Sequence, residues 1–188
     1  MELTVHKIAA EFKLPMNPKC VKWGTNCPSR EPGVYIVSLP SVPTMFPVDL
    51  DVLAYWCTNT TNATFRDGTI LKPALLESEL RKYWHPSETI VYIGKAKSLR
   101  RRLYQYYGTP LGSSRPHAGG YWIQTLKDLN TLDVCWFEHK HAAQLEKEIL
   151  TYFSQNVVCN CNICIPYANL QIDGQHRRVH NVRRPIIP

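Results

Sequence analysis

Three short runs rich in β-branched and aromatic residues constrain the fold of this chain more than any other feature. They are GVYIVSL at 33–39, ETIVYIG at 88–94 and LDVCWFE at 132–138. The first run follows Pro32, and the third alternates in character and ends in an acidic residue. Runs of this length and composition are typical of strands. The sequence therefore predicts a small three-stranded sheet.

Helical segments are predicted around this sheet. The predicted helices are 2–14, 73–84, 97–107, 121–129 and 141–155. Pro73 suits the first turn of its helix, and Ser98 is a plausible N-cap. Residues 15–32 and 108–120 are rich in proline, glycine and polar residues, so they are predicted loops. The order of elements predicts a single α/β (α+β) domain, a small sheet flanked by helices, over residues 1–188.

Two segments depart from this simple pattern. Residues 40–88 form a large insert between the first two strands, and residues 156–188 form a basic, cysteine-containing C-terminal extension. Within the insert, DLDVLAYW fits either a short helix or a strand. Asp67-Gly68 predicts a tight hairpin turn.

One carboxylate lies where helical periodicity expects an apolar side chain. At 100° per residue, Glu146 falls within the apolar stripe of the helix 141–155, whereas Glu148 points away from it. The stripe consists of Ala142, Leu145, Ile149, Tyr152 and Phe153. An inward carboxylate costs free energy unless it is paired or binds a cation. An edge glutamate, a buried ion pair and a cation ligand all satisfy this pattern.

One guanidinium borders an apolar face in a similar way. Arg102 lies next to the face formed by Leu99, Leu103 and Tyr106, whereas Arg100 and Arg101 point outward. The outward pair fits a solvated basic face or contacts with phosphates. Arg102 is placed to direct its planar fork into a cleft, where it suits phosphate oxygens.

The strand and helix residues together resemble the GIY-YIG nuclease family. Gly33-Val34-Tyr35 and Val91-Tyr92-Ile93-Gly94 look like its two half-motifs. The continuation from Lys95 to Leu103 is similar to the nuclease domain that makes one incision in bacterial nucleotide excision repair. The motif arginine then falls on Arg102 and the motif glutamate on Glu146. The resemblance covers 33–39 and 88–155, and the long insert departs from the family's short link.

This resemblance implies a metal-dependent endonuclease. Glu146 would bind one Mg²⁺ or Mn²⁺ ion, and Arg102 would neutralise charge on the phosphate. Tyr35 or Tyr92 would activate water, with Lys95 or Arg102 as the cation that lowers its pKa. Neither tyrosine is preferred at this point.

Further residues are predicted to support the site or to contact nucleic acid. His117, in a loop with two glycines, could relay a proton or hold a phosphate, or be an ordinary exposed histidine. Arg100, Arg101 and Tyr106 are predicted nucleic-acid contacts, with histidine replacing the tyrosine in some family members. The family's late asparagine fits Asn160, Asn162 or Asn169, of which Asn169 is preferred.

The net charge of +7 favours a polyanionic partner, and DNA is the partner predicted here. A catalytically inactive nucleic-acid-binding module of the same fold, with or without a stabilising zinc ion, is the alternative, and a zinc-stabilised interaction domain is a third interpretation. An enzyme that cuts both strands would act as a homodimer, although the sequence has no interface signature. No secretory signal and no membrane-spanning run is recognised, so a cytoplasmic location is expected.

The seven cysteines are expected to be reduced thiols rather than a disulfide framework. Cys159, Cys161 and Cys164, with His176 and His180, approximate the spacing of a zinc finger, but Pro166 and Asp173-Gly174 interrupt it. Cys20 and Cys27 could instead complete a four-thiolate site. Idle or buried thiols are the favoured interpretation, and any zinc would be structural.

Overall fold

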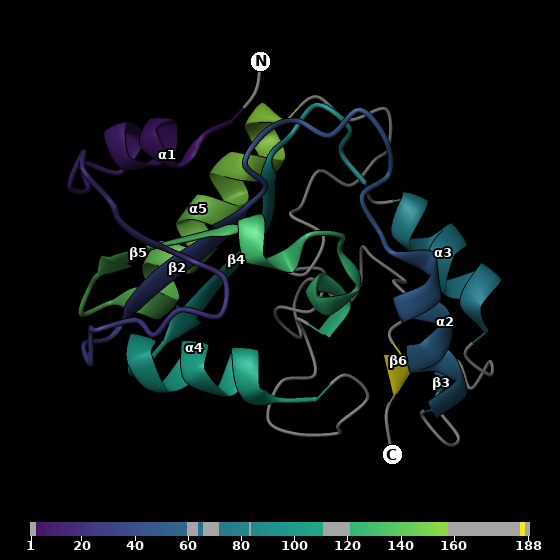
Figure 1. Cartoon of the computed structure of the whole chain (residues 1–188). Helices are drawn as coiled ribbons and strands as arrows, with labels where there is room; N and C mark the ends of the chain where they lie inside the picture. The colour runs from purple at the N-terminus through teal and green to yellow at the C-terminus, as the bar shows by residue number, and fades with distance from the viewer. Residues whose placement is uncertain are drawn as a thin grey trace.

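A four-stranded antiparallel sheet forms the centre of the computed structural model, in the order β1-β5-β2-β4 (Figure 1). Its strands are β1 (Lys19–Lys22), β2 (Gly33–Ser38), β4 (Ile90–Ala96) and β5 (Asp133–Glu138). The structure describes residues 3–59, 64–65, 72–82, 84–110, 121–157 and 185–186. The mixed α/β class and all three predicted strands are confirmed. Strand β2 lies between β4 and β5 and is buried along its whole length.

The predicted sheet of three strands is corrected to four, because β1 lies inside the segment predicted to be a loop. Its sequence, KCVK, contains no apolar run and is mostly exposed. Pairing with β5 makes it a strand, and the ion pair between Lys22 Nζ and Asp133 Oδ1, 2.8 Å apart, joins the two strands at one end. The local composition does not predict such an edge strand.

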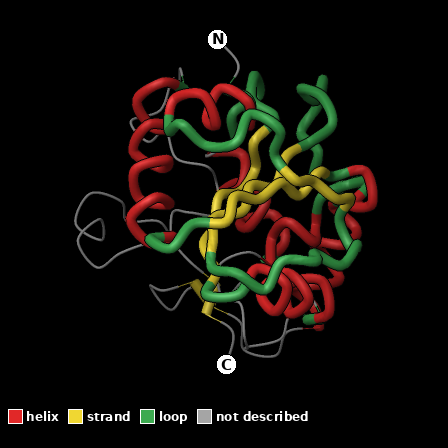
Figure 2. Tube along the Cα trace, turned by 90° about the vertical axis from the view of Figure 1, so that its left-hand side faces the viewer, coloured by secondary structure: helices red, strands yellow, loops and turns green. Residues whose placement is uncertain are grey.

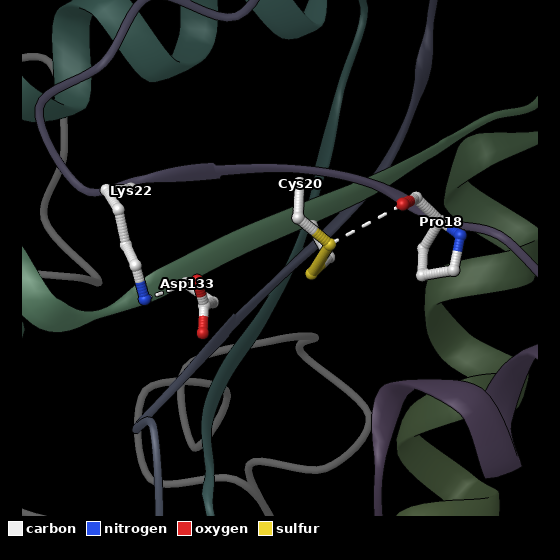
Figure 3. The surroundings of a disulfide bond; sticks show 5 residues. Pro18, Cys20, Lys22 and Asp133 are labelled. Atoms are coloured by element: carbon white, nitrogen blue, oxygen red, sulfur yellow. Dashed lines mark hydrogen bonds and ion pairs between the residues drawn. A yellow bond between two sulfur atoms is a disulfide. The ribbon is translucent and has the colours of Figure 1, made fainter.

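A disulfide between Cys20 and Cys135 also ties β1 to β5 (Figure 3). The two residues lie directly opposite each other in the antiparallel register. The prediction of reduced thiols was therefore wrong for this pair, and Cys20 is not available to a four-thiolate zinc site. The Sγ atom of Cys20 lies 3.6 Å from the carbonyl oxygen of Pro18. Since a disulfide sulfur carries no hydrogen, this approach is a contact rather than a donated hydrogen bond.

Helices cover both faces of the sheet (Figures 1 and 2). Helix α4 (Leu99–Gly108) packs on the face that carries Tyr35 and Val37. Helices α1 (Val5–Glu11) and α5 (Ala142–Asn156) cover the opposite face, which carries Val34 and Ile36. Successive side chains of β2 therefore enter two different apolar cores. These three helices confirm the predicted segments, with shorter ends for α1 and with Ser98 at the N-cap of α4.

Gly33 permits close packing at the start of β2. A Cβ atom at this position would lie 2.2 Å from the carbonyl oxygen of Phe137 and 2.9 Å from Cδ1 of Leu99. These distances are below any ordinary contact, so only glycine lets β2 approach β5 and α4 this closely.

The insert contains two helices that pack against each other, α2 (Leu50–Asn59) and α3 (Pro73–Lys82). Helix therefore prevails over strand in the ambiguous segment, and Asp49 explains why. Its Oδ1 atom accepts hydrogen bonds from the backbone N–H groups of Asp51 (3.0 Å) and Val52 (3.1 Å), as an N-cap does. Leu53 extends the core that includes Tyr35 into the insert. Asp67-Gly68 lies outside the described residues.

Short elements complete the described chain. The predicted helix 121–129 forms two 3-10 helices instead, η1 (Tyr121–Thr125) and η2 (Leu129–Thr131). Strands β3 (Thr64–Phe65) and β6 (Pro185–Ile186) pair in a separate two-stranded sheet. Among the helices of the described segments, none has both the length and the apolar character needed to cross a membrane.

Candidate active site

Two tyrosines are brought together by the pairing of β2 with β4. Tyr35 lies opposite Gly94 in the register, and Tyr92 lies two residues before that glycine. A Cβ atom on Gly94 would lie 2.4 Å from Cε1 of Tyr92, 2.8 Å from Cζ of Tyr35 and 2.9 Å from its hydroxyl oxygen. The absence of a side chain at residue 94 therefore makes the space in which both phenols pack.

Tyr106 of α4 completes a cluster of three phenols. The rings of Tyr35 and Tyr92 are stacked with their centroids 5.6 Å apart. The centroid of Tyr106 lies 5.7 Å from that of Tyr92 and 6.3 Å from that of Tyr35. All three phenols are buried: the exposed fraction is 0% for Tyr35, 7% for Tyr92 and 1% for Tyr106. Tyr106, predicted to contact nucleic acid, is thus a packing neighbour of the other two phenols rather than an accessible surface residue.

Arg102 directs its guanidinium from α4 into this cluster, as its position beside the apolar face predicted. It forms a side-chain hydrogen bond with Tyr35 and interacts electrostatically with Tyr92. Burial works against the charged form of Arg102, but these phenols outweigh burial and raise its pKa above the ordinary arginine value. Its Nε atom is buried and has no hydrogen-bond partner within the described part of the chain. A buried donor of this kind is suited to an anion that is not part of the protein.

Glu146 approaches the cluster from α5, on the other side of the sheet. Only 2% of the residue is exposed, which confirms that it points inward. Its Oε2 atom lies 2.7 Å from Nζ of Lys95, whose side chain remains 45% exposed. An ion pair, one of the alternatives considered from the sequence, is therefore present, but only its carboxylate is buried. Lys95 follows Gly94 on β4, and its ammonium contacts the carboxylate rather than a phenol.

The carboxylate and the guanidinium belong to one electrostatic system. Burial raises the pKa of Glu146 above its usual value, while Lys95 and then Arg102 oppose the rise. Glu146 in turn raises the pKa of both Tyr35 and Tyr92. The edge strand β4 thus has α4 on one side and α5 on the other, and charges from both helices act on the same phenols (Figure 1).

The two phenols differ in how readily they ionise. Burial raises the pKa of Tyr35, whereas the positive charge of Arg102 and hydrogen bonds with Tyr92 and Arg102 lower it. Burial raises the pKa of Tyr92 much further, and the interaction with Tyr35 adds to that rise. Arg102 therefore acts in the direction predicted for a cationic neighbour, but burial outweighs it. Hydrogen bonds with Arg102 and Tyr92 thus favour the ionised form of Tyr35.

Two of the other predicted site residues, Arg100 and Arg101, do not join this cluster. Arg100 and Arg101 lie on the outer side of α4 and line a separate pocket. His117 and Asn169 lie outside the described residues, as do the cysteines and histidines of the zinc-like pattern. Within the segments that the structure describes, no group of three or more histidine, cysteine or acidic side chains could hold a metal ion.

Some residues of these sites escaped the sequence analysis. Asn26, Arg30 and Tyr104 line the pocket beside Arg100 and Arg101. Only the spacing of Arg100 and Tyr104, four residues apart on a helix, could have placed one of them on that face. Asn26 and Arg30 belong to the predicted loop, where periodicity carries no information.

Comparison of the chain with protein-family models, with curated proteins and with solved structures finds no match.

Proposed function

We propose that this chain is a divalent-metal-dependent endonuclease of the GIY-YIG type that hydrolyses phosphodiester bonds in DNA. One observation carries the proposal. A buried carboxylate and a half-buried guanidinium, on separate helices, act on two stacked phenols of neighbouring strands. Helical periodicity and the family resemblance had marked Glu146 and Arg102 independently. A structural core has no need of four such polar groups at one place.

Each group has a role in phosphodiester hydrolysis that suits its surroundings. Arg102 offers a charged, partly unpaired fork to the phosphate, where it would offset the negative charge that develops on the oxygens. Tyr35 is the better candidate for the base that accepts a proton from water, because its phenolate is favoured by Arg102 and by the hydroxyl of Tyr92. Tyr92 would hold the position of Tyr35. Lys95 would hold Glu146 in its ionised form.

The donor set fits a hard divalent cation that shares its shell with the substrate. Mg²⁺ is commonly bound by one or two carboxylates together with substrate phosphates and waters, and Glu146 supplies one carboxylate. Its oxygen Oε2 is held by Nζ of Lys95 at 2.7 Å, and the carboxylate also accepts a hydrogen bond from the backbone of Lys95, so a cation would share this carboxylate with Lys95. When bound, the cation would polarise the phosphate as a Lewis acid. DNA is preferred as the polyanion because of the net charge of +7 and the family resemblance.

The test is a cleavage assay with Mg²⁺ or Mn²⁺ on plasmid, single-stranded and branched DNA, with the product ends mapped. Glu146→Gln is compared with the matched variant Glu148→Gln on the same helix. Glu148 is exposed and its Oε1 atom accepts a hydrogen bond from Gln144 at 2.9 Å. Cleavage should fall by at least about a hundredfold in Glu146→Gln, in line with the loss of a main stabilising group. It should change by less than about threefold in Glu148→Gln, since surface substitutions cost little.

Equal cleavage by wild type and Glu146→Gln would refute the role given to this carboxylate. Loss of activity through unfolding is controlled by thermal denaturation. Because burial raises the pKa of Glu146 above its usual value, ionisation of this carboxylate is less favourable in the folded chain than in the unfolded chain, and a neutral glutamine should fold about as well. Lys95 loses a partner in this variant, but its half-exposed side chain remains hydrated.

A DNA-binding module without cleavage activity is the second candidate, and two observations favour it. Tyr35 is fully buried, and Glu146 is already neutralised by Lys95. Under this alternative, the cluster would stabilise the edge of the sheet, and the basic surface of the protein would bind DNA. The same assay separates the two functions, because a binding module retains DNA affinity while no metal ion or substrate gives mapped products.

A further inference from the structure

A pocket of about 380 Å³ opens at the start of α4, on the side of that helix away from the phenols. It is lined by Asn26, Arg30, Ser98, Arg100, Arg101 and Tyr104. The lining contains three guanidinium groups and no carboxylate. Arg100 and Arg101 are neighbours in the first turn of α4, and Tyr104 lies one turn beyond Arg100, whereas Arg102 faces the sheet. One helix therefore presents arginine to two different places.

Backbone hydrogen bonds explain why Arg30 joins this group from a distant part of the sequence. The amide of Arg100 donates to the carbonyl of Ser29 (2.7 Å), and the amide of Leu99 donates to the carbonyl of Glu31 (3.0 Å). Arg30 lies between these two anchored residues and is thereby fixed beside the first turn of α4. These bonds also occupy two amides of that turn, so side chains rather than the helix terminus must hold a ligand.

The positive charge of the pocket comes from Arg30, Arg100 and Arg101. Throughout the described segments, no ion pair joins Arg30, Arg100 or Arg101 to an acidic side chain. Like charges held this close repel one another. Guanidinium groups in this arrangement are suited to the oxygens of more than one phosphate.

An aromatic ring stands at the same pocket. Tyr104 is 68% exposed, while Tyr106, two residues along, is 1% exposed. An exposed ring beside arginines is the combination with which proteins hold unpaired bases, because a base stacks on the ring while its phosphates meet the guanidinium groups. In a duplex the faces of the bases are already stacked and are not available to such a ring.

We propose that this pocket binds a single-stranded segment of nucleic acid, with Arg30, Arg100 and Arg101 holding backbone phosphates and Tyr104 stacking on a base. The inference rests on the proposed nuclease function, for which it supplies a substrate preference. The pocket and the phenols lie on different sides of one helix, whose width is about 10–12 Å. A strand held in the pocket would therefore reach the phenols within a few nucleotides. The preferred substrate is DNA with an unpaired segment beside the cut.

The test measures binding without cleavage. Fluorescence anisotropy of the full chain, in EDTA, uses a labelled 20-nucleotide single strand and the blunt duplex of the same sequence. Arg30→Ala/Arg100→Ala is compared with Lys140→Ala/Lys147→Ala, which removes the same charge from exposed positions outside the pocket. We expect the arginine variant to weaken single-strand binding by roughly tenfold or more. The slope of log affinity against log salt concentration should become shallower by about 1.4, because each lost phosphate contact on a single strand contributes about 0.7. The lysine variant should change affinity for the single-stranded DNA by less than about threefold, because those lysines lie outside the pocket that holds it.

The aromatic contact has its own pair of variants. Tyr104→Ala should weaken single-strand binding by roughly fivefold to a hundredfold. Tyr104→Phe should bind as wild type does, because it keeps the ring and loses only the hydroxyl. Thermal denaturation checks that each variant is folded. If the arginine double variant is unstable, Arg30→Gln/Arg100→Gln replaces it, since glutamine keeps much of the aliphatic contact.

Three results would overturn the inference: no binding of single strands by wild type, equal losses in the arginine and lysine variants, or wild-type affinity in Tyr104→Ala. Tighter binding of the duplex than of the single strand would overturn the substrate preference. Arginine-dependent binding without cleavage by wild type would reject the nuclease and keep the pocket. Cleavage that depends on Glu146 but not on Arg30 would keep the nuclease and reject the pocket.

Discussion

Replacement of Gly94 by alanine tests the architecture of the phenol cluster directly. The new methyl group would lie 2.4 Å from Cε1 of Tyr92 and 2.8 Å from Cζ of Tyr35. Carbon atoms in contact prefer about 3.5–4.0 Å, so both rings would have to move by roughly 1 Å. The rings are 7% and 0% exposed and are packed against Tyr106, which leaves them little room to do so.

Overpacking of this kind costs about 1–3 kcal/mol, and contact with two rings places the cost near the upper end. Alanine also offsets about 0.5–1 kcal/mol of this loss of stability, because it has fewer backbone conformations than glycine in the unfolded chain. The net loss of unfolding free energy should be about 2 kcal/mol, which corresponds to a melting temperature lower by about 4–8 °C for a chain of this size. Differential scanning calorimetry measures both quantities.

Gly108→Ala is the matched control, because a Cβ atom at this last residue of α4 meets nothing within 4 Å. It should raise the melting temperature slightly, since alanine favours a helix by about 0.5–1 kcal/mol. Combining Gly94→Ala with Tyr92→Ala should cost less than the sum of the two single changes, because the closest contact is removed. Unchanged stability in Gly94→Ala would show that the rings do not lie over this glycine, and the description of the site would fail.

Four further predictions concern charge and covalent structure. Because burial raises the pKa of Glu146, the acid limb of the cleavage profile should lie above the usual glutamate pKa of about 4.3, and a limb below that value would contradict the buried carboxylate. The rate should go on rising from pH 7 to pH 9, because burial also raises the pKa of Tyr35; a plateau from pH 7 would reject this base. Lys95→Ala should lower the unfolding free energy by about 1–2 kcal/mol, less than for a fully buried pair because Lys95 is half exposed, as urea denaturation would reveal. Reduction of the Cys20–Cys135 disulfide, which closes a long loop, should cost about 2–5 kcal/mol, and an intact mass unchanged by reductant would show that the bond does not form.

The strands and the long helices could be predicted because their signals are local. The apolar run at 33–39 and the stripe of the helix 141–155 each encode their own structure through periodicity. Glu146 and Arg102 were identified for the same reason, since a charge within an apolar stripe is visible without knowing what lies opposite. Edge strand β1 was missed because KCVK becomes a strand only by pairing with β5, 115 residues away at the disulfide.

The sequence by itself determined which side chains point inward, because periodicity within one element decides that. It left open whether Glu146 met a lysine or the solvent and which tyrosine formed a hydrogen bond with Arg102. Tertiary structure decided both, by placing Lys95 2.7 Å from the carboxylate and Arg102 in a hydrogen bond with Tyr35. Distances between elements depend on the packing of whole helices against a sheet, and the pKa of a buried group depends on those distances. No local pattern contains either quantity.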